Sequence, residues 1–187
     1  MSSGLAETAR ELRCSERTLR RYVNEGTLRG ERVGRQELRL PRAEELYLLR
    51  HWEVLSRLRR ALRTEPGVRL AVLFGSMAVG EDRPDSDVDL LIDHATGDLE
   101  DVVRLQRRLQ GRVGSPVHLV LLEDVDRAPA LLTDILLEGR VLVDRSGGWH
   151  KLGRRREQVV REAAAEEAVT HDAAWRGVAE ARKRLEA

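Results

Sequence analysis

Short apolar runs separated by polar turns mark the central part of the chain. The runs that predict buried strands lie at 68–74, 88–92 and 116–121. Apolar residues at helical spacing predict two amphipathic helices, at 98–110 and 130–138. Gly75 ends the first strand, and Gly111 and Gly139 end the two helices. We therefore expect an α/β (α+β) domain at 65–145, behind a boundary at 64–67.

The amino-terminal pattern predicts two short helices followed by a hairpin. A serine near the start can cap a first helix that ends at Leu12, and Ser15 can cap a second helix at 16–25. Two short runs around a glycine-containing turn predict the hairpin at 28–40. Together these elements indicate a separate small module at 1–40.

A long helix is predicted after Pro41, at 42–63, because proline is favoured at the first position of a helix. Five leucines at helical spacing form its predicted apolar stripe: Leu46, Leu49, Leu55, Leu58 and Leu62. We expect the segment 41–64 to connect the two domains. The same helix is a candidate dimerisation element.

The carboxyl-terminal segment, 149–187, is rich in Ala, Glu and Arg, a strongly helix-forming composition. A linker at 146–148 precedes it, and its apolar stripe is broken. Two interpretations remain open. The segment either packs on the surface of its own chain or forms a helical arm that binds a partner or a second copy, with Trp175 as its anchor.

Composition indicates a globular chain of 187 residues, with 41% hydrophobic and 35% charged residues. No apolar run approaches the roughly 20 residues that a membrane span needs, so we expect no membrane partner. The start of the chain lacks the pattern of a signal peptide. Cys14 is the single cysteine, so no internal disulfide can form. These features predict a cytoplasmic protein.

Charge is segregated along the chain, although the net charge is only +1. Residues 1–64 hold 15 Arg and 9 acidic residues, a net charge of +6. Residues 65–148 hold 9 Arg and 16 acidic residues, a net charge of −7. A basic module beside an acidic one indicates a polyanion-binding head on a metal-binding body. Docking of the two domains on each other would explain the same pattern.

The second predicted helix has one apolar and one basic side. Leu19, Tyr22 and Val23 fall at helical spacing and should pack inward. The residues left to project outward are Arg17, Arg20, Arg21 and Asn24, with Arg32 and Arg35 at the tip of the hairpin. Such side chains can contact phosphates and base edges in a major groove. The alternative is a helical hairpin with a solvated arginine face.

The segment 15–22, followed by Glu25-Gly26-Thr27-Leu28, resembles the winged helix-turn-helix proteins of the MerR and excisionase types. The resemblance covers about 40 residues. It implies that the second helix enters the major groove of an operator and that the wing touches the DNA backbone. Because such domains often bind paired half-sites, a homodimer is expected.

The most specific pattern in the chain is Gly75-Ser76, ten residues, then Asp87-x-Asp89. Side chains two apart on a strand share a face, so both carboxylates should point the same way, as oxygen ligands of Mg²⁺ do. Gly75 lets the backbone approach a ligand closely, and Ser76 offers a hydroxyl at the start of a helical turn. The pattern therefore predicts a metal–triphosphate site.

These four residues resemble the signature of polymerase β-type nucleotidyltransferases, and most closely the minimal nucleotidyltransferases that include antitoxin partners of HEPN toxins. The resemblance runs from about 68 to 144 and includes a closing helix and strand at 131–144. It implies a mixed-sheet nucleotidyltransferase fold, Mg²⁺ or Mn²⁺, and a nucleoside triphosphate such as ATP. It also implies transfer of a nucleoside monophosphate to an acceptor hydroxyl, for example a tyrosine of a partner toxin.

One position departs from that family. The third carboxylate of such enzymes lies on a later strand, where this chain has His118. Imidazole is a poor ligand for Mg²⁺, and a two-metal mechanism needs both ions. His118 could act instead as a general base, Glu123 or Asp124 could supply the missing oxygen, or the site could be degenerate.

The leading hypothesis is a DNA-binding regulator with a nucleotidyltransferase fold, the antitoxin of a toxin–antitoxin pair that binds its operator. Asp87, Asp89 and His118 are its candidate catalytic residues, with the two aspartates as metal ligands. Gly75 and Ser76 are the candidate nucleotide-binding residues. A catalytically silent transcription factor is the second hypothesis, and a small-molecule nucleotidyltransferase is the third.

Overall fold

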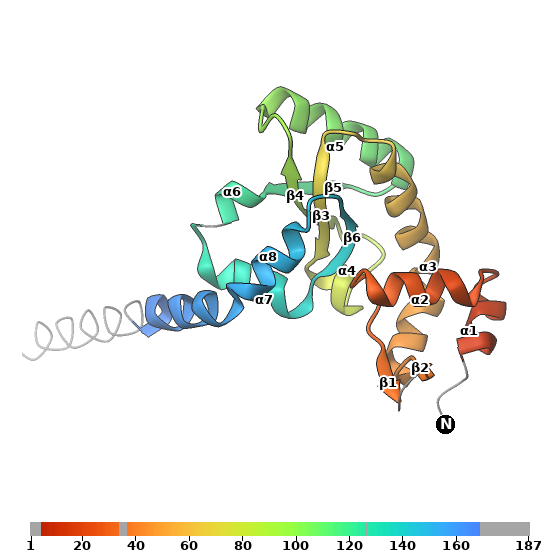
Figure 1. Cartoon of the computed structure of the whole chain (residues 1–187). Coiled ribbons are helices and arrows are strands. Elements are labelled where there is room, and N and C mark those ends of the chain that lie inside the picture. The colour runs from red at the N-terminus through yellow and green to blue at the C-terminus, as the bar shows by residue number, and fades with distance from the viewer. Residues whose placement is uncertain (1–4, 34–36, 126, 169–187) are drawn as a thin grey trace, which may run out of the picture.

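The computed structural model describes residues 5–33, 37–125 and 127–168. Its amino-terminal part consists of helices α1 (Leu5–Glu11) and α2 (Glu16–Asn24) and an antiparallel hairpin of strands β1 (Glu31–Val33) and β2 (Glu37–Arg39) (Figure 1). Ser15 caps α2, because its hydroxyl accepts a hydrogen bond from the Thr18 amide at 3.1 Å. The two helices and the hairpin lie where the sequence predicts them.

Helix α3 (Arg42–Arg63) follows the hairpin directly. Its leucines Leu55, Leu58 and Leu62 are fully buried, as expected. Leu46 and Leu49, by contrast, are each 52% exposed, so the predicted stripe is wrong in the first half of the helix. The buried face there consists of Tyr47, Leu48 and His51, with Glu44 and Glu45 beside them. The stripe prediction favoured leucines, and it missed that buried ion pairs and hydrogen bonds can place polar residues inward.

The central sheet has the strand order β5-β4-β3-β6. Its strands are β3 (Val68–Phe74), β4 (Val88–His94), β5 (Val117–Leu121) and β6 (Arg140–Asp144). Strand β3 pairs antiparallel with β4 and β6, whereas β4 and β5 run parallel. The sheet is therefore mixed, as the family resemblance implies.

Helices cover both faces of this sheet (Figure 1). Helices α3 and α5 (Leu99–Val113) pack on the face that includes Leu73 and Leu90. Helices α7 (Pro129–Glu138) and α8 (Gly148–Arg154) pack on the face that includes Leu70 and Leu91. Two short helices, α4 (Ser76–Val79) and α6 (Leu122–Val125), follow β3 and β5. Because successive side chains of a strand point to opposite faces, the strands contribute apolar side chains to the packed layers on both faces of the sheet.

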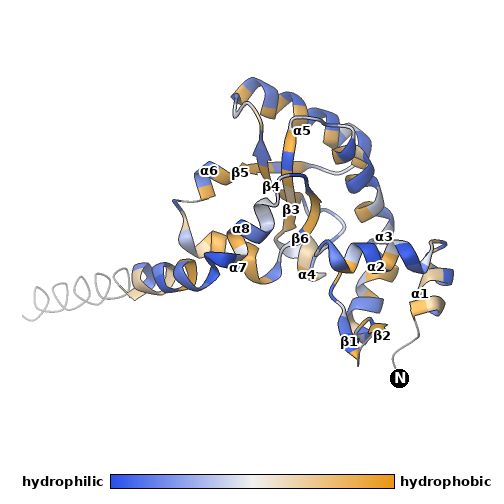
Figure 2. Ribbon diagram, viewed as in Figure 1, coloured by the Kyte–Doolittle hydropathy of each residue, from blue (hydrophilic) through white to orange (hydrophobic). Residues whose placement is uncertain are grey.

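One apolar core joins the amino-terminal part to the sheet. Leu19 of α2, Leu40 and Leu48 belong to the same buried cluster as Leu90 of β4. Figure 2 shows the strongly hydrophobic residues gathered along the strands and the inner sides of the helices. The turn at 64–67 is part of this assembly, because Glu65 is buried and bonds Arg108 of α5 at 2.8 Å.

A helical segment at 156–168 follows α8. Trp175, the expected anchor of a partner-binding arm, lies outside the described residues. Across the parts of the chain that the structure describes, no helix is both long and apolar enough to pass through a membrane.

Candidate active site

The turn between β3 and α4 brings the backbone close to a carboxylate of the neighbouring strand. Phe74, at the end of β3, pairs with Asp89 of β4. The next residue, Gly75, has a φ of 72°, which residues with side chains rarely adopt. A Cβ atom on Gly75 would lie only 2.7 Å from Asp89 Oδ2. Glycine is therefore required here by backbone conformation and by space.

The two aspartates of the motif lie together with His118. Asp87 directly precedes β4, Asp89 lies within it, and His118 stands opposite Asp89 on the parallel strand β5. His118 Nε2 is 3.6 Å from Asp87 Oδ2, and His118 Nδ1 is 3.5 Å from Asp89 Oδ1. The side chain of His118 is 58% exposed. The structure thus brings together three residues that the sequence separates by up to 31 positions.

The electrostatics of this cluster favour a bound cation. Partial burial raises the pKa of Asp89, and the nearby Asp87 carboxylate raises it further, whereas His118 lowers it. The raised pKa means that the negative charge on Asp89 is incompletely stabilised by its surroundings. A divalent cation between the carboxylates would supply the missing stabilisation.

The residues fit a cation that is only partly held by protein. Asp87 and Asp89 offer carboxylate oxygens, the ligand type that Mg²⁺ prefers. Within residues 5–33, 37–125 and 127–168, no group of three His, Cys, Asp or Glu side chains is arranged to hold a metal ion. The remaining ligands would have to be phosphate oxygens and water, as is usual for Mg²⁺.

Glu123 and Asp124 do not replace the third carboxylate. Both lie in α6, beyond the carboxyl end of β5, whereas His118 lies near its start. A strand rises about 3.3 Å per residue, which places this end of β5 more than about 10 Å from His118. Glu123 instead lines a separate cleft with Arg69 and Asp93. That interpretation of the sequence is wrong.

Ser76 is the first residue of α4 and is partly exposed beside Gly75.

Asp93, at the far end of β4, forms an ion pair with Arg69, whose Nε donates to Asp93 Oδ1 at 3.0 Å. Asp93 is thus separate from the Asp87–Asp89 pair.

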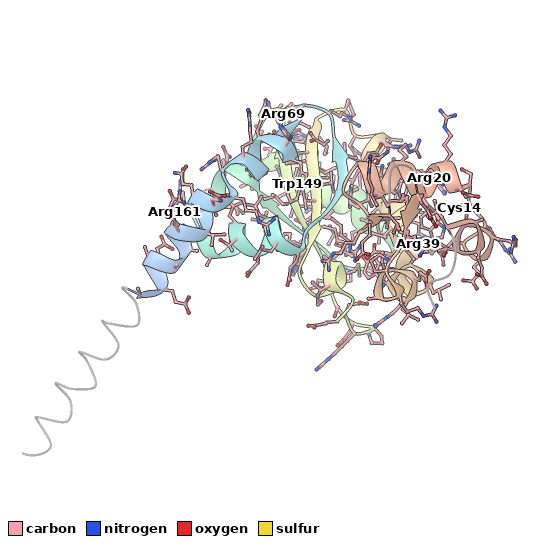
Figure 3. The ribbon with its side chains drawn as sticks, turned by 60° about the horizontal axis from the view of Figure 1, so that its bottom comes forward. Cys14, Arg20, Arg39, Arg69, Trp149 and Arg161 are labelled. Carbon is pink, nitrogen blue, oxygen red and sulfur yellow. The ribbon has the colours of Figure 1, made fainter. Side chains whose placement is uncertain are left out.

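The outward face of α2 is basic and exposed, as the sequence predicts. Leu19 and Tyr22 are buried on the opposite side. The exposed residues are Arg17, Arg20, Arg21 and Asn24, with Arg32 exposed on the hairpin (Figure 3 labels Arg20). Arg35 lies outside the described residues. Arg20 forms an ion pair with Glu16 at 3.5 Å, a contact that an exposed arginine can exchange for phosphate.

Sequence reasoning missed a buried polar network next to α4. It consists of Glu44, Tyr47 and His51 of α3 with Arg140 of β6. Charged residues in a helix or at a strand end normally indicate exposure, so the pattern carried no signal of this network.

Residues 56–147 match the protein family described as "Polymerase beta, Nucleotidyltransferase". This part of the chain is a nucleotidyltransferase domain of the polymerase β type. The match runs from the second half of α3 to just beyond β6 and includes Gly75, Ser76, Asp87 and Asp89. No curated protein matches the chain by sequence.

The nucleotidyltransferase fold also occurs in solved toxin–antitoxin complexes. A structure described as a toxin–antitoxin with AMP-PNP contains a chain that is 23% identical, with a TM-score of 0.54 over 65% of this chain and 98% of that chain. A structure of MntA–HepT gives 21% identity, a TM-score of 0.51, and coverages of 66% and 98%. The structure of the tri-AMPylated Shewanella oneidensis HEPN toxin in complex with MNT antitoxin gives 20% identity and a TM-score of 0.52, over 67% of this chain and 98% of that chain. These similarities establish a shared fold, and they leave about a third of this chain unmatched.

Proposed function

We propose that this chain is a DNA-binding regulator that binds a metal–nucleotide complex and acts as the antitoxin of a toxin–antitoxin pair. The observation that carries the proposal is the convergence of Gly75, Asp87 and Asp89 within a polymerase β-type nucleotidyltransferase domain. The shared fold with antitoxin complexes, one of them described with AMP-PNP, supports the choice of ligand and of partner.

In this proposal Asp87 and Asp89 hold Mg²⁺ or Mn²⁺, and Ser76 and the backbone of Gly75 hold phosphates of a nucleoside triphosphate, ATP in the first instance. A bound divalent cation would neutralise charge on the phosphates. The absence of a Cβ on Gly75 lets the turn pass close to the Asp89 carboxylate, which a Cβ would approach to 2.7 Å. Asp89 gains most from the cation, because its pKa is raised by burial and by Asp87.

If the domain is active, an acceptor hydroxyl oxygen bonds to the α-phosphorus while the bond to the leaving pyrophosphate breaks. His118 is exposed on the carboxylate edge and would take the proton of the hydroxyl as a general base. One of the structures with a shared fold is described as containing a tri-AMPylated HEPN toxin. A hydroxyl of a partner toxin is therefore the proposed acceptor.

The amino-terminal module is proposed to bind operator DNA through the basic face of α2. The exposure of Arg17, Arg20 and Arg21 and the hairpin behind them support this role. A small-molecule nucleotidyltransferase would have no need of such a face. We therefore rank that function below the DNA-binding regulator.

A catalytically silent domain is the second candidate, and His118 is the observation that favours it. An imidazole stands where a third oxygen ligand would be needed for a second metal ion. A His118→Asp variant that transfers nucleotide to the partner toxin, when the wild-type chain does not, would favour the silent domain. Transfer by the wild-type chain would exclude it.

The test of the site is calorimetric titration of ATP into the full-length chain, with and without Mg²⁺. We expect Mg²⁺-dependent binding that becomes at least about tenfold weaker in an Asp87→Asn/Asp89→Asn variant, because the cation loses both carboxylates. A Glu81→Gln/Asp85→Asn variant is the matched control, since both residues are exposed in the preceding loop and the charge change is the same.

Equal ATP binding by the Asp87→Asn/Asp89→Asn variant and the wild-type chain would contradict the assigned metal ligands. Failure of the wild-type chain to bind ATP or any other nucleoside triphosphate would contradict the nucleotide site as a whole. The control variant separates these results from a general effect of lost negative charge.

A further inference from the structure

Two buried side chains donate hydrogen bonds to backbone carbonyls of α4. Tyr47 of α3 donates its hydroxyl hydrogen bond to the Met77 carbonyl at 3.1 Å. Arg140 of β6 donates from Nε to the Ala78 carbonyl at 2.6 Å. Tyr47 is 7% exposed and Arg140 2%. Helix α4 begins one residue after Gly75, so its position and the shape of the proposed phosphate turn are linked.

Arg140 also contacts the amino-terminal module. Its two terminal nitrogens bond the Glu44 carboxylate at 2.5 and 3.0 Å, and one of them also bonds the Thr27 carbonyl at 3.3 Å. Glu44 in turn accepts from the Arg29 amide at 3.1 Å. Thr27 and Arg29 lie between α2 and the hairpin. The same guanidinium therefore contacts α4, which follows the proposed nucleotide turn, and the proposed DNA-binding module.

Close packing leaves this network little freedom to absorb a displacement. The Arg140 guanidinium lies 3.5 Å from the centroid of the Tyr47 ring. The Tyr47 ring also stacks on the His51 ring, with centroids 4.3 Å apart, and lies against Gly80 at the end of α4, where a Cβ would lie 3.2 Å from Tyr47 Cδ2. Because protein interiors are close-packed, a shift of α4 has to move Tyr47 and Arg140.

A second connection fastens the loop that carries Asp87. His51 of α3 faces the Asp82 carboxylate with Nε2 at 2.7 Å and the Tyr47 carbonyl with Nδ1 at 2.9 Å. Arg50 also bonds the Asp82 backbone carbonyl. Both segments that flank the proposed site, α4 and this loop, are thus attached to the helix that supports the amino-terminal module.

We propose that nucleotide binding at the Gly75–Asp89 site and DNA binding by α2 are energetically coupled through Tyr47, Arg140 and Glu44, the junction network. The inference rests on the proposed function, because both ligands belong to it. Each ligand changes the affinity of the other by the same factor, as thermodynamic linkage requires. The coupling makes the occupancy of the operator depend on the nucleotide state of the antitoxin.

The experiment measures DNA affinity by fluorescence anisotropy at fixed salt, with and without saturating α,β-methylene-ATP and Mg²⁺. The probe is a duplex selected from a random library with the full-length chain. In this analogue a methylene group replaces the oxygen between the α- and β-phosphates, so the bond that transfer would break is not available and transfer stays out of the measurement. We expect the dissociation constant of the duplex to change by at least about fivefold, and the nucleotide affinity to change by the same factor when DNA is saturating.

A Tyr47→Phe variant tests the route. It removes the hydrogen bond to the Met77 carbonyl and keeps the ring beneath Arg140. We expect each ligand still to bind alone and the coupling factor to fall below about twofold. Tyr22→Phe is the matched control, because Tyr22 lies outside the junction network, and it should keep the factor. An Asp82→Asn variant, which removes the carboxylate charge that faces His51 Nε2, should also reduce it.

The outcomes separate the inference from the proposed function. A coupling factor of one in the wild-type chain, with both ligands bound, would overturn the coupling and leave the proposed function intact. A coupling factor that persists in both Tyr47→Phe and Asp82→Asn would contradict coupling through the junction network. If either ligand fails to bind the wild-type chain, the proposed function fails and the coupling fails with it.

Discussion

At the scale of single residues, Tyr47 shows how the surroundings of a side chain set its chemistry. Burial raises its pKa to about 12, with Arg140 lowering it and Glu44 raising it by charge. The phenol is 7% exposed and donates to a carbonyl, so the neutral form is the one that the folded chain accommodates. A tyrosine that appears ordinary in the sequence thus becomes a fixed hydrogen-bond donor.

The raised pKa of Tyr47 predicts a loss of stability at alkaline pH. Its contribution is fully present below the ordinary pKa of 10 and is lost as the pH rises towards about 12, because the unfolded chain releases the proton first. A shift of about 2 pH units corresponds to roughly 3 kcal/mol of the free energy of unfolding. Denaturant unfolding between these pH values, compared in wild type and Tyr47→Phe, measures it.

Tyr22→Phe provides the comparison, because the chain has two tyrosines. The absorbance of the phenolate that forms near pH 12 should disappear in Tyr47→Phe and remain in Tyr22→Phe. If instead Tyr47→Phe and the wild-type chain lose stability equally between pH 10 and 12, Tyr47 is not the group that titrates.

At the scale of elements, α2 combines an inward apolar side with an outward basic side. Burial of Leu19 and Tyr22 against the core fixes which arginines face the solvent. The Ser15 cap fixes where the helix begins and therefore how its face is rotated. Both features follow from local sequence, which is why the prediction of this element succeeds.

Replacement of Arg17 and Arg20 by Ala should weaken DNA binding. Each lost phosphate contact should also lower the slope of log affinity against log salt by about 1. The measurement is a salt series of binding titrations with the selected duplex. Arg104→Ala/Arg107→Ala is the matched control, because both arginines are exposed on α5 and the charge change is equal. Equal loss in the two variants would indicate a non-specific charge effect and contradict an α2 interface.

At the scale of the whole molecule, the described residues share an apolar core across the junction. Leu40 and Leu48 pack in the same cluster as Leu73 and Leu90 of the sheet. A bidentate ion pair between Glu44 and Arg140 crosses the same junction with both side chains about 3% exposed. The amino-terminal module should therefore unfold together with the nucleotidyltransferase domain.

A Glu44→Gln variant should lower the free energy of unfolding by about 3–5 kcal/mol, because Arg140 would keep a buried charge without its partner. Glu37→Gln removes the same charge from an exposed pair with Arg39 and should cost about 1 kcal/mol or less. Thermal unfolding of both variants measures the difference. Two separate transitions in the wild-type chain, or equal effects of the two substitutions, would contradict a shared core.

Local sequence patterns determined most of the elements and the candidate site. The apolar runs predict β3 and the start of β4, and the alternation along β4 places Asp87 and Asp89 on one face. The apolar run around His118 predicts a strand, and the family resemblance implies that this strand carries the third position of the site. These predictions succeed because strand periodicity and turn chemistry depend on residues close together in the chain.

Tertiary structure alone decided which polar residues are buried and which acidic residues meet. Glu44, His51 and Arg140 are buried because partners far away in the sequence neutralise them or form hydrogen bonds with them. Glu44 and Arg140, for example, are 96 residues apart. Glu123 is excluded from the site because α6 begins at the opposite end of β5. The cost of burying a charge depends on its partners in space, and one sequence does not specify those partners.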